Sequence, residues 1–153
     1  MRITADDALS MLQKAPTAEL MADADDCRRK LHGTKIHYVH SFNLNPTNLC
    51  ENRCGLCAFW RERGADDAYV LTLDEARGEL ESARGLNPTD LHIVGGIIPE
   101  LDLGYYEKLL RLAKELLPDA LIQGMTAVEI QWLADRTGIP VRDALSRLRD
   151  AGM

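Results

Sequence analysis

Apolar residues recur at helical spacing through the first part of the chain. The first run follows Thr4, a good N-cap residue, and stops at Pro16, which cannot continue a helix. A second run follows directly and closes at Gly33, a residue type favoured just past helix ends. Cys27 belongs to its apolar stripe, so we expect this cysteine on the buried face of the helix rather than in a ligand set. The pattern predicts an N-terminal helical segment over residues 1–34.

From residue 35 onward, short extended runs alternate with longer helical ones. Two helix starts carry a capping box, in which a threonine and a glutamate three positions later accept from each other's backbone amides. The expected elements are a strand over 35–45 that ends at Pro46, a helix opened by Thr72 and Glu75, a strand over 91–95, a helix over 106–117, a strand over 120–124, and a helix pair opened by Thr126 with Glu129 and by Pro140. This order predicts an α/β domain over residues 35–153 with parallel strands and right-handed helical crossovers.

Each expected strand is followed by a segment with functional potential. A cysteine-rich loop follows the first strand, Gly95 and Gly96 follow the second, and Met125 and Thr126 follow the third. Ligands of α/β sheets bind beyond the carboxyl ends of the strands. We therefore expect the three segments to meet at one edge of the sheet.

Composition restricts the class of protein. The 153 residues suit one domain, and 46% of them are hydrophobic, enough to form a core. A net charge of -6 argues against a nucleic-acid partner. No apolar run approaches the ~20 residues of a membrane span, and the N-terminus lacks the apolar core of a signal peptide. Free thiols suit a reducing compartment, so we expect a cytoplasmic protein without a membrane or nucleic-acid partner.

Cys50, Cys54 and Cys57 form a Cys-x-x-x-Cys-x-x-Cys motif with metal-ligand spacing. Thiolates select zinc, copper(I) or iron-sulfur clusters. Structural zinc normally takes four ligands in paired units, and no second pair follows here, whereas three cysteines leave one iron of a cubane cluster open for chemistry. The spacing favours an iron-sulfur cluster over zinc, and a disulfide is the weakest of the three interpretations. A zinc-stabilised binding module and an iron-sulfur electron carrier remain as alternatives of another class.

The wider motif resembles the radical S-adenosylmethionine superfamily. Beside the three cysteines, the resemblance includes Asn45 to Cys50, the run from Cys57 to Arg61, and Gly64. It points to the branch of aminofutalosine synthase, dehypoxanthine futalosine cyclase and FO synthase, and His92 to Gly96 with Thr126 to Ile130 are most similar to the first. The similarity runs from about residue 35 to residue 153 and covers only the front half of such an enzyme.

This resemblance implies an enzyme with a 4Fe-4S cluster and S-adenosyl-L-methionine as cofactors. Its activity would be that of a transferase of menaquinone biosynthesis, in which a 5'-deoxyadenosyl radical adds to 3-[(1-carboxyvinyl)oxy]benzoate and aminodeoxyfutalosine forms. The cyclase and an FO synthase subunit are the alternatives within the branch. The implied partners are the small-molecule substrate and an electron donor such as flavodoxin or ferredoxin.

The resemblance also assigns individual residues. Cys50, Cys54 and Cys57 would hold the cluster. A second group would contact cofactor or substrate: Gly95 and Gly96 through their backbone at the methionyl amino group, Leu56 through its backbone at adenine, and His92 and Arg61 at the substrate. From its strand position alone His92 is more often a hydrogen-bonded core histidine, and a solvated loop is the commoner place for an arginine.

The chain stops at Met153, where a fourth strand is expected to begin. Three strand-helix units cannot close a barrel, so we expect N-terminal helices followed by the first half of a radical SAM (β/α) barrel, incomplete in this chain. We expect the 153 residues to bind a cluster but to turn over substrate poorly.

Overall fold

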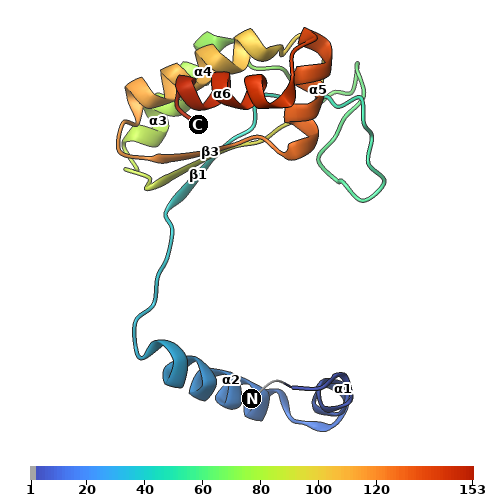
Figure 1. Cartoon of the computed structure of the whole chain (residues 1–153), viewed down its shortest axis with the longest axis vertical. Coiled ribbons are helices and arrows are strands. Elements are labelled where there is room, and N and C mark those ends of the chain that lie inside the picture. Colours follow the sequence, from blue (N-terminus) through green and yellow to red (C-terminus); the bar gives the residue numbers. More distant parts are fainter. Residues whose placement is uncertain (1–2) are drawn as a thin grey trace. The chain divides into compact units, whose positions relative to one another are not determined.

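The computed structural model describes residues 3–153 and divides into two units, the second running from Val39 to Met153 (Figure 1). The first unit contains two helices, α1 (Ala5–Lys14) and α2 (Thr17–His32). Thr4 caps α1 and forms a capping box with Asp7, and Pro16 separates the two helices. Both helices lie where the apolar pattern predicts them.

The prediction that Cys27 is buried is wrong. Its thiol is free and exposed, and neither α1 nor α2 contains a fully buried residue. Apolar side chains along both helices are largely exposed, including Leu12 at 77% and Leu31 at 70%. Helical periodicity locates the apolar stripe of a helix, but it does not show that another element covers that stripe.

The first strand is also shorter than predicted. It begins at Ser41 rather than at Lys35, and β1 spans Ser41–Leu44. The apolar residues that favoured an extended run, Ile36, Tyr38 and Val39, are exposed and lie outside the strand. β-propensity reports a fit to a half-buried pleated surface, and no strand among residues 3–153 pairs with these residues to provide that surface.

The second unit is an α/β structure. After β1 its elements are α3 (Leu73–Arg84), β2 (Asp90–Ile93), α4 (Leu103–Leu116), β3 (Leu121–Gly124), α5 (Ala127–Thr137) and α6 (Val141–Ala151). The strands form a parallel sheet in the order β1-β2-β3, with Asn43, His92 and Gln123 in register. The predicted fold class, parallel strands with helical crossovers, is confirmed.

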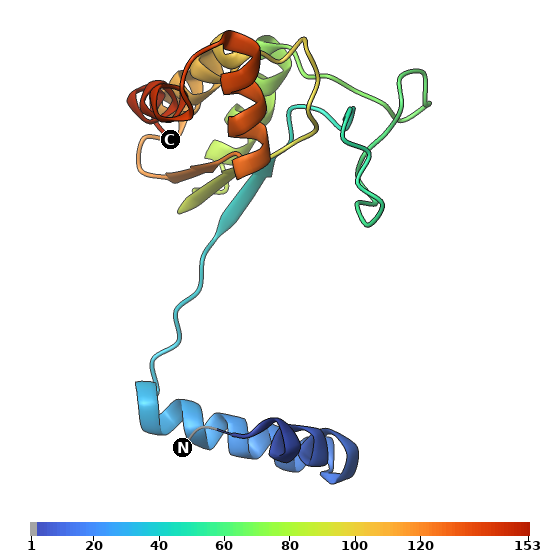
Figure 2. The same cartoon turned by 45° about the vertical axis from the view of Figure 1, so that its right-hand side comes forward.

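The helices lie against one face of the sheet (Figures 1 and 2). That face carries most of the apolar strand residues, of which Leu44, Leu91, Ile93 and Ile122 are buried. They pack into one core with residues of α3 to α6, including Ala76, Leu80, Leu109, Leu110, Leu133, Ala144 and Leu148. Alternate strand residues point to the opposite face, which is the geometry that a barrel interior requires.

The helix termini follow local signals in the sequence. Thr72 with Glu75 and Thr126 with Glu129 form the two predicted capping boxes of α3 and α5. Gly138 ends α5 in the left-handed conformation, φ 68°, where glycine is favoured. Among the helices of residues 3–153, none is both long enough and apolar enough to cross a membrane.

Candidate cofactor site

A long loop that follows β1 carries the three cysteines, and its two ends are tied together. The backbone N–H of Leu71 donates to the Pro46 carbonyl at 2.8 Å, and Thr47 bridges Val70 in antiparallel fashion. Thr47 is fully buried, and its hydroxyl donates to the Tyr69 carbonyl at 2.6 Å. The loop is therefore closed at its base, directly beyond the carboxyl end of β1.

The predicted meeting of three segments at this edge is confirmed. The Gly96 N–H donates to the Thr47 carbonyl at 2.8 Å, which ties the β2 end to the cysteine loop. The Gly95 N–H donates to Glu129 Oε1 at 3.2 Å, and the other oxygen of that carboxylate accepts from the N–H of Thr126. Glu129 is 3% exposed. Its capping role was visible in the sequence, but its bond to Gly95 depends on tertiary structure.

Gly96 is required by close packing against the cysteine loop. A Cβ at this position would lie 2.6 Å from the Leu49 carbonyl carbon, closer still to its oxygen, and 3.1 Å from the Cys50 Cβ. A Cβ at Gly95 would meet the Thr47 carbonyl oxygen at 3.1 Å. The missing side chains thus allow two backbones to approach each other. Contact between these glycines and a methionyl amino group stays a prediction.

The thiol groups are accessible and free of disulfides. Cys50 is half-buried, whereas Cys54 and Cys57 are exposed. The N–H of Cys57 donates to the Cys54 carbonyl at 3.0 Å, which makes a tight turn between them. Within residues 3–153, no three His, Cys, Asp or Glu side chains converge as a metal site. Three thiols on one closed loop fit the ligand chemistry of an iron-sulfur cluster, although cluster binding requires their sulfur atoms to move together.

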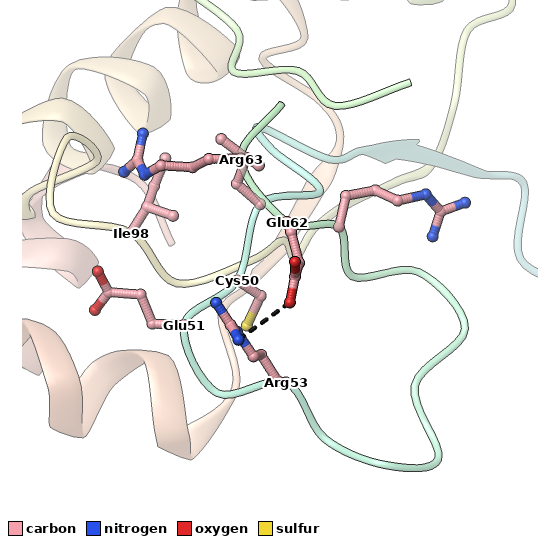
Figure 3. Close-up of a pocket in the computed structure, with 8 residues that line it drawn as sticks. Cys50, Glu51, Arg53, Glu62, Arg63 and Ile98 are labelled. Carbon is pink, nitrogen blue, oxygen red and sulfur yellow. Dashed lines mark ion pairs between the residues drawn. The ribbon is translucent and has the colours of Figure 1, made fainter. Parts of the chain in front are cut away.

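A cavity of about 240 Å³ lies beside Cys50 (Figure 3). Its walls carry charges of both signs: Glu51, Arg53, Arg61, Glu62 and Arg63, together with Leu49 and Ile98. Arg53 pairs with Glu62 at 3.1 Å, and Arg63 pairs with Glu100 at 2.6 Å. The cavity offers hydrogen-bond partners both to an anionic group and to a cationic one.

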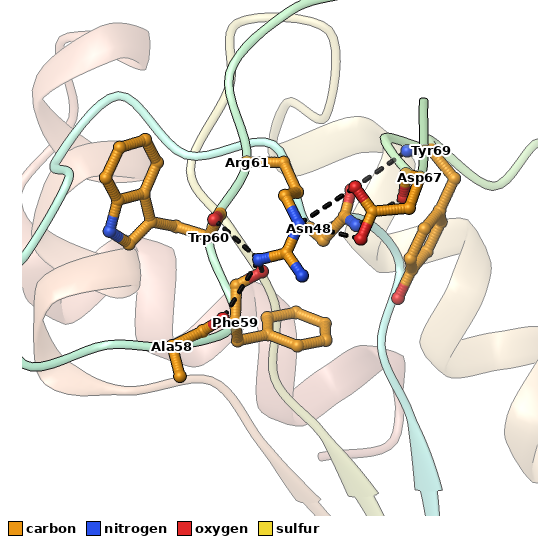
Figure 4. Close-up of polar contacts among 7 residues, drawn as sticks. All are labelled: Asn48, Ala58, Phe59, Trp60, Arg61, Asp67 and Tyr69. Atoms are coloured by element: carbon orange, nitrogen blue, oxygen red, sulfur yellow. Dashed lines mark hydrogen bonds and ion pairs between the residues drawn. The ribbon is translucent and has the colours of Figure 1, made fainter. Parts of the chain in front are cut away.

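Arg61 makes an extensive set of bonds within its own loop (Figure 4). Its Nε donates to both carboxylate oxygens of Asp67, at 2.9 and 2.8 Å. Its Nη1 donates to the carbonyls of Ala58, Phe59 and Trp60 at 2.9, 3.2 and 3.0 Å. The proposed contact between Arg61 and a substrate carboxylate stays a prediction, for which Nη2 remains without a bond inside residues 3–153.

His92 lies on the sheet face opposite the helices, next to Asn43 and Gln123. Its side chain is exposed, so the interpretation of His92 as a core histidine is wrong, whereas its contact with a substrate inside a barrel stays a prediction. Below this row Asp90 is 5% exposed and accepts from Ser41 Oγ at 2.7 Å and Gln123 Nε2 at 2.8 Å. Sequence analysis missed this polar network, because cross-strand pairing alone assembles it.

Leu56 lies between two of the cysteines and is 95% exposed. Its side chain makes no packing contribution to the loop, so its exposure leaves its backbone accessible. The proposed contact between that backbone and adenine stays a prediction.

Comparisons with known proteins agree with this architecture. The chain is 34% identical over 152 residues to aminodeoxyfutalosine synthase of Streptomyces coelicolor, covering 99% of this chain and 39% of that protein. It is 33% identical over 152 residues to a 5-amino-6-(D-ribitylamino)uracil--L-tyrosine 4-hydroxyphenyl transferase of Methanosarcina barkeri, covering 99% and 38%. The chain thus spans about two fifths of these relatives.

A solved structure shows the same fold. The crystal structure of methylornithine synthase matches with a TM-score of 0.65 at 17% identity, covering 99% of this chain and 54% of that one. The profile of the Radical SAM superfamily, whose members use a 4Fe-4S cluster and S-adenosylmethionine, matches residues 44–153. That range includes all three clustered cysteines, the last residue of β1, and the whole of β2 and β3. The chain belongs to the radical SAM superfamily.

Proposed function

We propose that Cys50, Cys54 and Cys57 hold a 4Fe-4S cluster at the carboxyl edge of the sheet and that the protein acts in radical S-adenosylmethionine chemistry. The observation that carries this proposal is the match of the Radical SAM superfamily over residues 44–153, a range that contains the three cysteines of the loop after β1. When bound, the cluster and S-adenosylmethionine supply a 5'-deoxyadenosyl radical. We propose residues 35–153 as a partial radical SAM core domain, whose compact unit begins at Val39, and residues 1–34 as an N-terminal helical segment.

The cavity beside Cys50 supports this proposal on chemical grounds. The methionyl part of S-adenosylmethionine carries an ammonium and a carboxylate, and charged partners of both signs line the cavity. Gly95 and Gly96 approach the same loop from β2, and Leu56 presents exposed backbone near the thiols. We assign these residues to cofactor binding.

On the substrate side, His92 lies in a polar row on the open face of the sheet. Neutral polar groups there can orient a substrate by hydrogen bonds without adding a net charge. We assign His92 to this role and retain Arg61, through its Nη2, as a second substrate contact.

We propose aminodeoxyfutalosine synthesis from 3-[(1-carboxyvinyl)oxy]benzoate as the reaction of the whole protein. The similarity to the Streptomyces coelicolor enzyme supports this choice. The reaction would take place in the cytoplasm, where thiols stay reduced, with flavodoxin or ferredoxin as electron donor. A second candidate is the FO synthase type of reaction, because the 4-hydroxyphenyl transferases and FO synthase of Streptomyces coelicolor are 31–34% identical, as similar as the first group.

The first test is anaerobic reconstitution of the purified chain with iron and sulfide, followed by reduction and addition of S-adenosylmethionine. We expect iron and sulfide to bind, 5'-deoxyadenosine to form, and Cys57→Ser to lose the cluster. Cys27→Ser is the matched control, because that thiol lies in α2, outside the loop. A colourless protein with one zinc ion would support the binding module, and a cluster indifferent to S-adenosylmethionine would support the electron carrier.

A second test separates the reactions. The reconstituted protein is incubated with 3-[(1-carboxyvinyl)oxy]benzoate, and in parallel with tyrosine and 5-amino-6-(D-ribitylamino)uracil, while 5'-deoxyadenosine and the coupled products are measured. Aminodeoxyfutalosine from the first mixture supports the main proposal. A product from the second mixture alone would transfer the assignment to the FO synthase type.

A further inference from the structure

Asn48, Arg61 and Asp67 tie together the two sides of the cysteine stretch (Figure 4). The Arg61 N–H donates to the Asn48 carbonyl at 2.7 Å, and Leu49 and Arg61 form a parallel bridge. The Asn48 side chain donates to the Asp67 carbonyl at 2.7 Å and accepts from the Tyr69 N–H at 2.9 Å. Asn48 is 5% exposed. We call Asn48, Arg61 and Asp67 the loop clamp.

The Arg61 guanidinium connects the loop clamp to the segment that leaves Cys57. Its Nη1 donates to three successive carbonyls, those of residues 58–60, while its Nε is held by Asp67. A planar guanidinium can serve the carboxylate and these carbonyls at once, whereas a lysine ammonium on a flexible stem is a point charge. The backbone just after Cys57 is therefore fixed by one side chain.

We infer that Arg61 is a positioning residue for the iron-sulfur cluster, an inference that rests on the proposed function of the three cysteines. The loop clamp begins before Cys50 and ends after Cys57, so it encloses all three thiols. Every bond of the clamp joins protein atoms, so the clamp closes the base of the cysteine stretch independently of metal, and only the thiol-bearing residues within it have to move together on binding. Part of the entropy cost of gathering the thiols is then met when the chain folds.

The expected size of the effect follows from loop length. Loss of the whole loop clamp, including the backbone bond from Arg61 to Asn48, would leave the Thr47–Val70 bridge as the next tie, and the length of the closed loop would roughly double. This sets the upper limit of the entropic effect. The closure entropy of a doubled loop lowers cluster affinity by about threefold. Freed carbonyls at residues 58–60 add to this loss, because they no longer fix the direction of the chain at Cys57.

A generic stabilising role predicts a different result. The Arg61 and Asp67 side chains are 36% and 62% exposed, and exposed ion pairs contribute little to global stability. Removing the pair should therefore change cluster retention much more than the unfolding midpoint. Another arginine–carboxylate pair, Arg147 with Glu107, lies between α6 and α4 and provides the control.

The experiment compares Arg61→Lys, Asp67→Ala and Asp67→Asn with Arg147→Lys after anaerobic reconstitution. The readouts are iron per chain, the rate at which cluster absorbance decays in an iron chelator, and the EPR spectrum of the reduced cluster. We expect decay up to about threefold faster in Arg61→Lys and Asp67→Ala, because the backbone bond from Arg61 to Asn48 remains in both variants. Asp67→Asn keeps an acceptor for Nε and should recover part of the loss, while Arg147→Lys should match the wild type.

Wild-type decay and an unchanged EPR spectrum in folded Arg61→Lys and Asp67→Ala would overturn the inference. If Arg61→Lys does not fold, Asp67→Ala decides, since its side chain is mostly exposed. If the wild-type chain binds no iron, the proposed function fails. The loop clamp is then tested in the metal-free protein by hydrogen exchange at the Arg61 and Tyr69 amides, which should accelerate in Asp67→Ala and not in Arg147→Lys.

Discussion

Substitution of Gly96 by alanine should both destabilise the protein and displace the cysteine loop. The added Cβ would lie 2.6 Å from the carbonyl carbon of Leu49 and closer to its oxygen, and real Cβ atoms essentially never approach within 3.0 Å. Leu49 is 7% exposed and its N–H is bonded to the Thr47 hydroxyl at 3.0 Å, so this backbone is held in place. Relief of the clash requires movement of backbone next to Cys50.

The loss in free energy of unfolding caused by Gly96→Ala can be compared with that of substitutions that overpack a core. Extra methyl groups in well-packed interiors cost about 1–3 kcal/mol, and a clash with backbone lies at or above the upper end. We therefore expect a loss of about 3 kcal/mol in the free energy of unfolding, a large share of the ~5–15 kcal/mol typical of a domain. The lost bond from Gly96 to Thr47, about 1 kcal/mol, is part of this total.

Three glycines of this chain form a graded series for the assay. Gly78 lies in α3 with no atom within 4 Å of an added Cβ, Gly95 meets one at 3.1 Å, and Gly96 clashes. Alanine should stabilise at Gly78 by about 0.5–1 kcal/mol, cost a smaller amount at Gly95, and cost most at Gly96. Chemical denaturation followed by circular dichroism measures the order, and iron content after reconstitution measures the displacement of the loop.

Equal unfolding midpoints for the Gly78 and Gly96 variants would refute this reasoning. Full iron loading of a destabilised Gly96→Ala protein would show that the protein can lose stability without displacement of the cysteine loop. It would show that the clash is relieved by movement of β2 rather than of the cysteine loop. Gly95→Ala then becomes informative, because its nearest contact is with Thr47, upstream of the cysteines.

Three further expectations concern the core, the sheet edge and alkaline pH. Leu109→Ala, at a fully buried position of α4, should cost about 2–5 kcal/mol in denaturant unfolding, and a loss below 1 kcal/mol would contradict its core position. Glu129→Gln leaves one of two backbone amides, those of Gly95 and Thr126, without an acceptor and should cost about 1–3 kcal/mol in free energy of unfolding. Glu75→Gln, in the exposed capping box of α3, should cost less. Equal losses would refute the bond between Glu129 and Gly95 as a stabilising contact. Burial raises the pKa of Tyr105 to about 12 and also raises that of Tyr106, and nearby negative charges act in the same direction. Because the folded state favours the protonated phenols, their contribution is complete below about pH 10 and should be lost as pH rises from about 10 to 12; a denaturation midpoint that stays constant over this range would contradict it.

Local signals account for the parts of the fold that were predicted correctly. The capping boxes at Thr72 and Thr126 each need only residues three positions apart, so the sequence contains their whole geometry. The alternation of short apolar runs and amphipathic stretches led to parallel strands in sequential order, because crossover connections have a preferred hand. The motif of Cys50, Cys54 and Cys57 is equally local, since its spacing is covalent.

The errors occur where a partner distant in the sequence decides the outcome. Cys27 lies on an apolar stripe, yet no described element of the first unit buries it. The first strand begins only at Ser41, the first residue that pairs with β2. His92 belongs to a buried strand but points to its open face, because alternate residues of a strand point to opposite sides.

The sequence by itself determined the order of the elements, the capping-box starts of α3 and α5, and the ligand chemistry of the cysteine motif, because each depends on residues close together along the chain. It did not determine the start of α4, which begins at Leu103 rather than at the predicted Tyr106. Tertiary structure alone decided that Gly96 packs on the cysteine loop, that Glu129 joins two strand ends, and that Arg61 directs its donors to carbonyls of its own loop. A side chain's type limits which bonds it can form, but the fold selects among partners by bringing distant backbone within hydrogen-bond distance.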